Sequence, residues 1–238
     1  MKTRNKPSRQ RKPSMFLKVG HRGARAYEIE NTLESFRKAL ELGANAVELD
    51  VRQSKDRKLV LSHDENLKRL FGSDVSVSQT TLKELKQLTG SKILTLEEAL
   101  RFLDRKVNKI LVELKETGYE KKVLEVIMKE KLLNRIIVVS FHEDTLVAMR
   151  SLHNKIETGF IYARFRNPVD AARRMGAVYL LPLYRFVHTR DVEKAHENNL
   201  KVIVWTINTR EEAREYSAKG VDGIASDKPD IFKGMAQG

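Results

Sequence analysis

The chain has 238 residues, 41% of them hydrophobic, which is enough for one large core and suits a single α/β barrel better than two small domains. It contains no cysteine, so disulfides, thiolate metal sites and a cysteine nucleophile are excluded, and any metal must bind oxygen or histidine. The net charge is +13, but residues 1–14 contribute six Lys or Arg and no acid, so the charge alone does not indicate a nucleic-acid-binding fold.

Residues 1–14 are polar and contain proline, and they cannot bury apolar surface, so we expect a disordered basic tail there. Residues 15–238 are expected to form one folded domain. No apolar run approaches the roughly 18 residues of a membrane-spanning helix, and the amino terminus lacks the apolar stretch of a secretory signal. We therefore expect a cytoplasmic protein that is not stably inserted in a membrane.

From residue 15 onward, short β-rich runs alternate with amphipathic helical stretches. This alternation is typical of repeated βα units around a parallel sheet. The candidate strands are residues 15–20, 45–51, 109–115, 135–141, 158–162, 177–181, 201–207 and 222–226. Eight such units predict a closed TIM-type (β/α)8 barrel.

A helix is predicted at residues 31–43, between the first two strands. Asn31 and Glu34 are expected to cap its start, and Gly43 is expected to end it. The apolar residues that share one face of this helix are Leu33, Phe36 and Leu40.

Residues 52–108 interrupt the rhythm of strands and helices. They hold an additional β-like run at 58–64, a polar stretch, and helical patterns at 82–88 and 96–103. We interpret this segment as a small insertion after the second strand, without a domain of its own.

Three carboxylates indicate a metal site. Glu48 and Asp50 lie two residues apart in a strand, so both point to one side while the apolar residues between them point to the other. Two buried neighbouring carboxylates repel each other, and a cation would neutralise them. Glu113, which shares its strand face with Lys115, is the candidate third ligand, and oxygen ligands of this kind suit Mg²⁺ or Ca²⁺. The alternative is a Glu113–Lys115 surface pair beside a solvated strand edge.

Two histidines are candidates for the chemistry. His21 ends the first strand, and the carboxyl ends of barrel strands are where active sites lie. A tight turn at 54–57 would set His63 opposite Glu48, although a bulge would shift that pairing by one residue. The histidines expected to be solvated or structural are His142, His153, His188 and His196.

Several motifs together resemble the glycerophosphodiester phosphodiesterases. They are VGHRGA, ENTLESFRKALELGANAVELDVRQSKD, LVLSHDENLKR and LVELK, with weaker similarity at VVSF, VIVWTIN and GVDGIASDKPD. The similarity runs from about residue 17 to 230, and the order and spacing of the first three motifs make it specific. Three positions depart from the common pattern of the family: Ile29, Arg57 and Ser226.

The resemblance implies a barrel enzyme that hydrolyses glycerophosphodiesters to glycerol 3-phosphate and an alcohol with the help of a divalent cation, Mg²⁺ or Ca²⁺. It further implies His21 and His63 as the acid/base pair and Arg22 and Lys115 as phosphate contacts. The metal ligands it implies are Glu48, Asp50 and Glu113. The expected partner is a small-molecule glycerophosphodiester substrate, and no nucleic acid is expected.

Trp205, the only tryptophan, stands in the seventh candidate strand. It would either pack in the barrel or form an apolar wall for the glycerol carbons.

Two competing functions stay open. A lysophospholipase D-like enzyme would use the same chemistry on lysophospholipids, but it needs an apolar rim, and residues 64–92 are mostly polar. A basic nucleic-acid-binding barrel would bind in a salt-sensitive way, but only the tail at 1–14 supports it. Deleting that tail would abolish binding if the barrel binds nucleic acid and would spare hydrolysis if the chain is a glycerophosphodiester phosphodiesterase.

Overall fold

The computed structural model describes residues 15–235. The predicted disordered tail at 1–14 lies outside the described residues. Within 15–235 there is no helix whose length and apolar character would let it span a bilayer.

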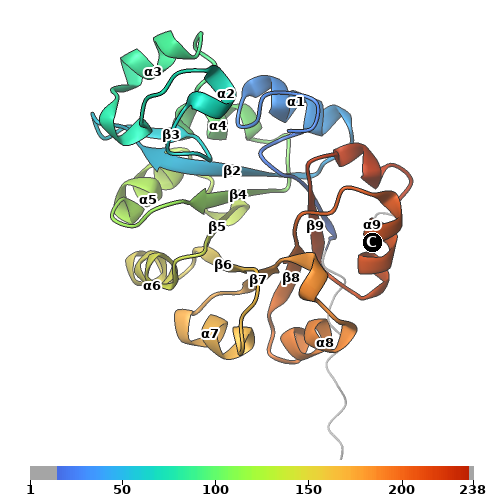
Figure 1. The fold of residues 1–238 in the computed structure, drawn as a ribbon. Coiled ribbons are helices and arrows are strands. Elements are labelled where there is room, and N and C mark those ends of the chain that lie inside the picture. Colours follow the sequence, from blue (N-terminus) through green and yellow to red (C-terminus); the bar gives the residue numbers. More distant parts are fainter. Residues whose placement is uncertain (1–14, 236–238) are drawn as a thin grey trace, which may run out of the picture.

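Eight parallel strands form a closed barrel, as predicted (Figure 1). Closure comes from β1, which pairs with β2 on one side and with β9 on the other. The barrel strands are β1 (Leu17–Gly20), β2 (Ala46–Gln53), β4 (Lys109–Leu114), β5 (Ile136–Ser140), β6 (Glu157–Tyr162), β7 (Tyr179–Pro182), β8 (Lys201–Val204) and β9 (Gly223–Ser226). Each corresponds to one of the eight predicted runs.

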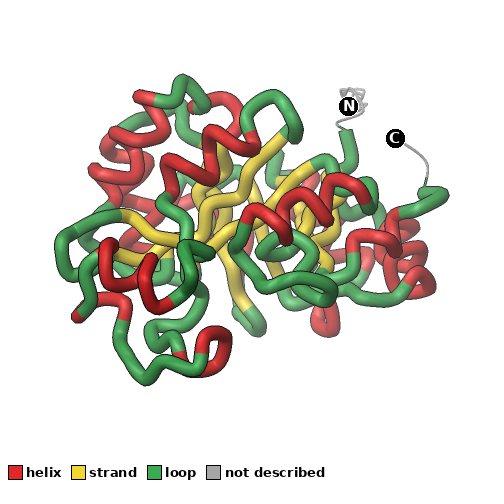
Figure 2. Tube along the Cα trace, turned by 90° about the horizontal axis from the view of Figure 1, so that it is seen from above, coloured by secondary structure: helices red, strands yellow, loops and turns green. Residues whose placement is uncertain are grey.

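Helices surround the strands on the outside of the barrel (Figure 2). The connecting helices are α1 (Leu33–Glu41), α4 (Leu96–Leu103), α5 (Glu120–Lys129), α6 (Glu143–Leu152), α7 (Pro168–Met175), α8 (Thr189–Glu197) and α9 (Arg210–Ala218). A short 3-10 helix, η4 (Pro229–Phe232), follows β9 and packs against β1 and α9. This arrangement gives every strand a helical cover, which is the TIM-type architecture.

The start of α1 differs from the prediction. Thr32, not Asn31, is the N-cap, because its hydroxyl accepts the backbone N–H of Ser35. Asn31 instead adopts a left-handed φ of 59° and directs its amide to Asp50. The predicted apolar face of α1 is confirmed, since Phe36 is fully buried and its neighbours on that face pack against the same cluster.

The insertion after β2 is smaller than predicted. It comprises β3 (Leu59–Leu61), α2 (Lys68–Phe71), the 3-10 helix η1 (Val77–Gln79) and α3 (Leu82–Leu88). Its own small apolar cluster consists of Val60, Leu67, Val77, Leu85 and Ile93. The second helical pattern, at 96–103, is α4, which packs into the main core with α1 and therefore belongs to the barrel.

The predicted hairpin register is wrong by one residue. β2 and β3 pair Val51 with Leu61, so the ladder does not set His63 opposite Glu48. The cause is the turn: the Ser54 N–H bonds to the Lys58 carbonyl, and Arg57 lies between them with a left-handed φ of 60°. This extra turn residue is the bulge that shifts the pairing.

The barrel interior changes character along its axis. Near the amino ends of the strands it is apolar, with Val19, Ala46, Leu111 and Ile203 in one cluster. Toward the carboxyl ends of β2 and β4, the inward positions are acidic. The apolar residues of β2 face the helices, as the alternation of side chains predicts.

Candidate active site

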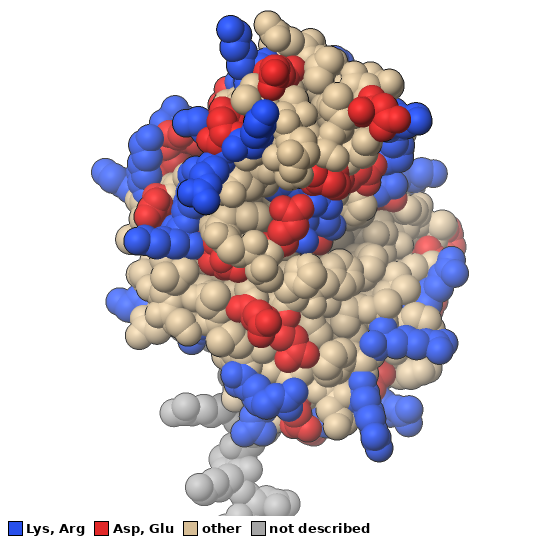
Figure 3. Space-filling view, turned by 60° about the vertical axis from the view of Figure 1, so that its left-hand side comes forward, with Lys and Arg blue, Asp and Glu red and all other residues tan. Residues whose placement is uncertain are grey.

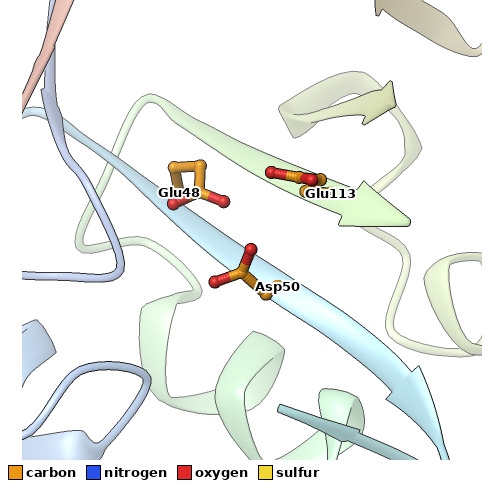
Figure 4. A group of neighbouring side chains, drawn as sticks. All are labelled: Glu48, Asp50 and Glu113. Carbon is orange, nitrogen blue, oxygen red and sulfur yellow. The ribbon is translucent and has the colours of Figure 1, made fainter. Parts of the chain in front are cut away.

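Three buried carboxylates converge inside the barrel. Glu48 and Asp50 come from β2 and Glu113 comes from β4, where Asp50 and Glu113 are partners in the ladder. One oxygen of each lies within 4.8 Å of the others, and all three point to the same side of the sheet (Figure 4). The side chain of Asp50 is fully buried. The three carboxylates that strand alternation predicted to share one side of the sheet therefore do lie together.

The protein itself leaves this cluster incompletely paired. Glu48 Oε1 and Asp50 Oδ1 are buried and have no hydrogen-bond partner. Burial and the neighbouring carboxylates raise the pKa of Glu48 well above its ordinary value, and the same causes raise the pKa of Glu113 to about 7. Orphaned buried oxygens and mutual repulsion are what a bound cation relieves. An all-oxygen donor set suits Mg²⁺ or Ca²⁺, so the residues present can hold such an ion.

Arg22 and Lys115 supply the positive charge beside the carboxylates. The Arg22 backbone N–H donates to Glu48 Oε2 at 2.9 Å, and its guanidinium Nε lies 3.1 Å from Asp50 Oδ2. Lys115 Nζ lies 2.6 Å from Glu113 Oε1 and 3.5 Å from Asp50 Oδ1. Although burial acts the other way, these charges lower the pKa of Asp50 below its ordinary value. Both cations thus partly offset the negative charge of the cluster.

His21 follows β1 and reaches the cluster from that side. Its Nδ1 lies 2.7 Å from Asp227 Oδ1, and its Nε2 lies 3.9 Å from Glu48 Oε2. Asp227 is held in turn by the Asn208 amide at 3.0 Å. Burial lowers the pKa of His21, although its hydrogen bond to Asp227 acts in the opposite direction. A histidine fixed through Nδ1 in this way presents Nε2 to the cluster.

His63 lies at the mouth of the barrel and is held in the same manner. Its Nδ1 lies 2.7 Å from Asp64 Oδ1, and Asp64 accepts a hydrogen bond of 2.5 Å from Arg69 on α2. Burial lowers the pKa of His63, whereas the charge of Asp50 acts to raise it. His63 and Lys115 line one broad hollow. Figure 3 shows acidic and basic side chains side by side next to a hollow in the centre of the face it presents.

Trp205 directly follows β8 and packs against the apolar cluster inside the barrel. Its indole Nε1 donates to the Leu181 carbonyl at 2.7 Å, and its ring meets Phe141 edge-on at 5.8 Å between centroids. The packing role is therefore present. Of the remaining histidines, His142 is exposed, with Nε2 3.2 Å from the Lys115 carbonyl, and His196 Nε2 is 2.8 Å from Asp222.

Sequence reasoning missed the residues that hold the site together. Asp227 orients His21, Asp64 orients His63, and Asn31 donates to Asp50. Glu30 bonds both Arg22, at 3.0 Å, and Arg69, at 2.6 Å. Each of these residues stands in a motif quoted above, but only the folded chain shows which side chain each one contacts.

Comparison with known proteins decides the family. The sequence model of the glycerophosphoryl diester phosphodiesterase family matches residues 21–231 of this chain. The chain belongs to this family. A glycerophosphodiester phosphodiesterase of Caldanaerobacter subterraneus is 31% identical over 232 residues, covering 91% of this chain and 96% of the relative. The family is an enzyme family, and the protein is a phosphoric diester hydrolase that acts on glycerophosphodiesters.

Solved structures of glycerophosphodiester phosphodiesterases share the fold. That of the Thermotoga maritima enzyme is 36% identical, with a TM-score of 0.79 and coverage of 92% of this chain and 98% of that one. A phosphodiesterase of Oleispira antarctica, in complex with the product sn-glycerol-3-phosphate, is 25% identical with a TM-score of 0.81, covering 90% and 94%. A lysophospholipase D of Homo sapiens is 38% identical over only 92 residues, which are 38% of this chain and 29% of that protein.

Proposed function

We propose that this phosphodiesterase hydrolyses glycerophosphodiesters to glycerol 3-phosphate and an alcohol by metal-dependent acid/base catalysis with His21 and His63. The observation that carries the proposal is the cluster of three buried carboxylates, which His21 Nε2 approaches to 3.9 Å at Glu48. His63 lines one hollow with Lys115, which pairs with two of these carboxylates, and each histidine is bonded through Nδ1 to another carboxylate. The proposed metal ligands are Glu48, Asp50 and Glu113, and the ion is Mg²⁺ or Ca²⁺.

When bound, the cation would supply positive charge to the phosphoryl oxygens, which a phosphodiester anion needs before a nucleophile can approach. Arg22 and Lys115 are proposed to contact the phosphate directly. Both side chains now lie against carboxylates, at 3.1 Å for Arg22 and Asp50 and at 2.6 Å for Lys115 and Glu113. A phosphate bound beside the cluster would compete with these carboxylates for the two cations.

The two histidines would divide the proton transfers. One takes the proton of the attacking hydroxyl, and the other donates a proton to the departing alkoxide, each contributing roughly 10²–10⁴-fold to the rate. The bonds from Nδ1 to Asp227 and to Asp64 leave Nε2 of each ring for the reacting atoms. Trp205 is proposed as an apolar wall for the glycerol carbons.

The attacking hydroxyl belongs either to water or to the substrate's own glycerol. Attack by the glycerol 2-hydroxyl would release a cyclic glycerol phosphate before glycerol 3-phosphate forms. Phosphorus NMR of a reaction in progress distinguishes the two, because only the second route gives a cyclic phosphate signal.

Metal removal and histidine variants test the proposal together. The protein is dialysed against EDTA and assayed on glycerophosphocholine before and after Mg²⁺ or Ca²⁺ is restored. We expect activity to vanish and then return, and His21→Ala and His63→Ala each to lower kcat by about 10²–10⁴-fold. His153→Ala is the matched control, since His153 follows α6 and bonds only locally. Full activity after EDTA, or in either active-site variant, would contradict the proposal.

The second candidate is lysophospholipase D activity, favoured by the similarity to the human lysophospholipase D. Activity on glycerophosphocholine and on lysophosphatidylcholine is compared with the same enzyme sample. The proposal predicts faster turnover of glycerophosphocholine, and faster turnover of the lysolipid would favour the alternative. A cytoplasmic location, the basic tail at 1–14 and the absence of a nucleic-acid partner stay predictions.

A further inference from the structure

A second pocket lies outside the barrel, between α7 and α8. Its volume is about 410 Å³, within the range of about 300–1,000 Å³ that is usual for small-molecule sites. Apolar side chains form its floor and walls: Val169, Leu180, Pro182, Val187, Val192 and Val202. Nothing in the catalytic chemistry described above uses this pocket.

The sheet separates this pocket from the catalytic centre. Leu180 of β7 and Val202 of β8 face the helices and line the pocket. Their strand neighbours Leu181 and Ile203 point to the opposite side, into the barrel interior. A molecule in the pocket therefore occupies the outer layer of the protein and leaves the carboxylate cluster free.

Three cations border the pocket without an acidic partner. Arg164, Arg166 and Lys194 line it, and none of them forms an ion pair among residues 15–235. Arg164 is held over the Phe186 ring at 4.2 Å. The one acid in the lining, Asp191, uses Oδ2 to accept the His188 N–H at the start of α8. The border is therefore positively charged over an apolar interior.

Tyr162 adds a neutral donor to the lining. It is half-buried, and its hydroxyl has no hydrogen-bond partner in the described part of the chain. Burial raises the pKa of Tyr162, so the hydroxyl keeps its proton at neutral pH. It can donate to an oxygen of a ligand head group.

We propose that the pocket between α7 and α8 is a binding site for an amphipathic anion, a short aliphatic chain that ends in a carboxylate or a phosphate. The chain would lie on the valine-rich floor, which removes apolar surface from water. The head group would lie between Arg164 and Arg166, whose guanidinium groups suit both carboxylate and phosphate oxygens.

The ligand would also contact the segment that supports Trp205. Phe186 lines the pocket and ends η3 (Tyr184–Phe186). The Tyr184 N–H donates to the Trp205 carbonyl at 2.9 Å. Because Trp205 is the only tryptophan, its fluorescence offers a probe of this end of the barrel during a titration.

Calorimetric titrations of the full chain test the proposal with octanoate, octyl phosphate and octyltrimethylammonium below their micellar concentrations. We expect both anions to bind at one saturable site and the cation not to bind. Arg164→Glu combined with Arg166→Glu should weaken anion binding about tenfold or more. The matched control, Arg173→Glu with Arg174→Glu, changes two exposed arginines of α7 outside the lining and should bind as the parent does.

Competition with glycerol 3-phosphate distinguishes this site from the catalytic centre. Saturating glycerol 3-phosphate should leave octyl phosphate binding unchanged, whether or not the proposed catalytic function holds. Displacement by glycerol 3-phosphate, equal binding of the cationic amphiphile, an equal loss in the control variant, or no binding of either anion would each overturn the proposal.

Discussion

Each of the two histidines proposed for the acid/base chemistry, His21 and His63, is held by a carboxylate through Nδ1, at 2.7 Å in both cases. For His21 that carboxylate comes from a distant part of the chain, and for His63 it is the next residue. An acceptor at Nδ1 fixes the tautomer and the orientation of the ring. Asp227 and Asp64 are therefore expected to act as positioning residues, through the histidines they hold.

Replacing these acids tests the positioning role. Asp227→Asn and Asp64→Asn keep the shape of each side chain but remove its charge and one of its two acceptor oxygens, both of which are in use in each aspartate. We expect kcat to fall, at most by the roughly 10²–10⁴-fold that a general acid or base contributes, with a shifted pH–rate profile and little change in KM. Asp74→Asn, an exposed change in the insertion, serves as the control. A parent-like pH profile in both variants would refute the positioning role.

Asp64 also makes stability depend on pH. Partial burial acts to raise its pKa, but the hydrogen bonds from Arg69 and His63 outweigh burial and lower the pKa from 3.8 to about 2. A pKa lowered by folding stabilises the protein above the unfolded value, and this stabilisation is lost as the pH falls through the folded value. Its contribution is therefore present near neutral pH and fades from about pH 5 downward.

Urea unfolding of the parent and of Asp64→Asn, followed over a series of pH values from about 6 to about 3, measures this contribution. The difference in the free energy of unfolding should be largest near pH 6 and should narrow as the pH falls. A difference that stays constant or widens on acidification would show that Asp64 is not ionised in the way described.

At the scale of elements, the loop between β1 and α1 carries the tightest backbone contact of the site. Gly23 has a left-handed φ of 86°, and a Cβ there would lie 2.6 Å from the Ser35 carbonyl carbon. Ser35 in turn bonds the Arg22 carbonyl and the Ala24 N–H. The close approach of this loop to α1 thus sets the position of Arg22.

Two glycine-to-alanine substitutions distinguish the effect of the close contact with Ser35 from the cost of a left-handed backbone conformation. Gly220 has nearly the same φ, 84°, with open space around it. Gly220→Ala should cost about 1–2 kcal/mol, the usual penalty for a left-handed alanine, and should keep activity. Gly23→Ala should cost more and should lower kcat. The free energy of unfolding and the hydrolysis rate are measured for both, and equal effects would show that the contact with Ser35 is unimportant.

The sequence predicted the elements better than it predicted their contacts. Alternation of side chains within β2 placed Glu48 and Asp50 on one face without any knowledge of the fold. The β2–β3 register was missed because Arg57 takes a left-handed conformation, which is common for glycine but rare for arginine; the bulge weighed as the alternative is the one that forms. Asn31 was read as a helix cap because asparagine often is one, whereas its amide bonds a carboxylate on a different element.

At the scale of the whole molecule, closure of the barrel completes the site. β1 pairs with β9, and Gly20 lies opposite Ser226. The residues that follow them, His21 and Asp227, consequently meet although 206 positions separate them in the chain. Local patterns carry no information about such a contact, since it depends on the register of strands from the two ends of the barrel. The eight-strand count predicted closure but could not supply that register.

Direct pairing of β4 with β2 brings Glu113 beside the two acids on β2, and the cluster so formed is central to the proposed catalysis. A calorimetric titration of the EDTA-treated protein with Mg²⁺ and with Ca²⁺ tests it most directly. Asp50→Asn removes one proposed ligand, and Glu65→Gln changes a carboxylate at the mouth of the barrel outside the cluster. We predict one cation bound per chain in the parent and in Glu65→Gln, with hydrolysis returning in step with occupancy, and strongly weakened binding in Asp50→Asn. Equal binding by Asp50→Asn, or full hydrolysis with no cation bound, would contradict the account.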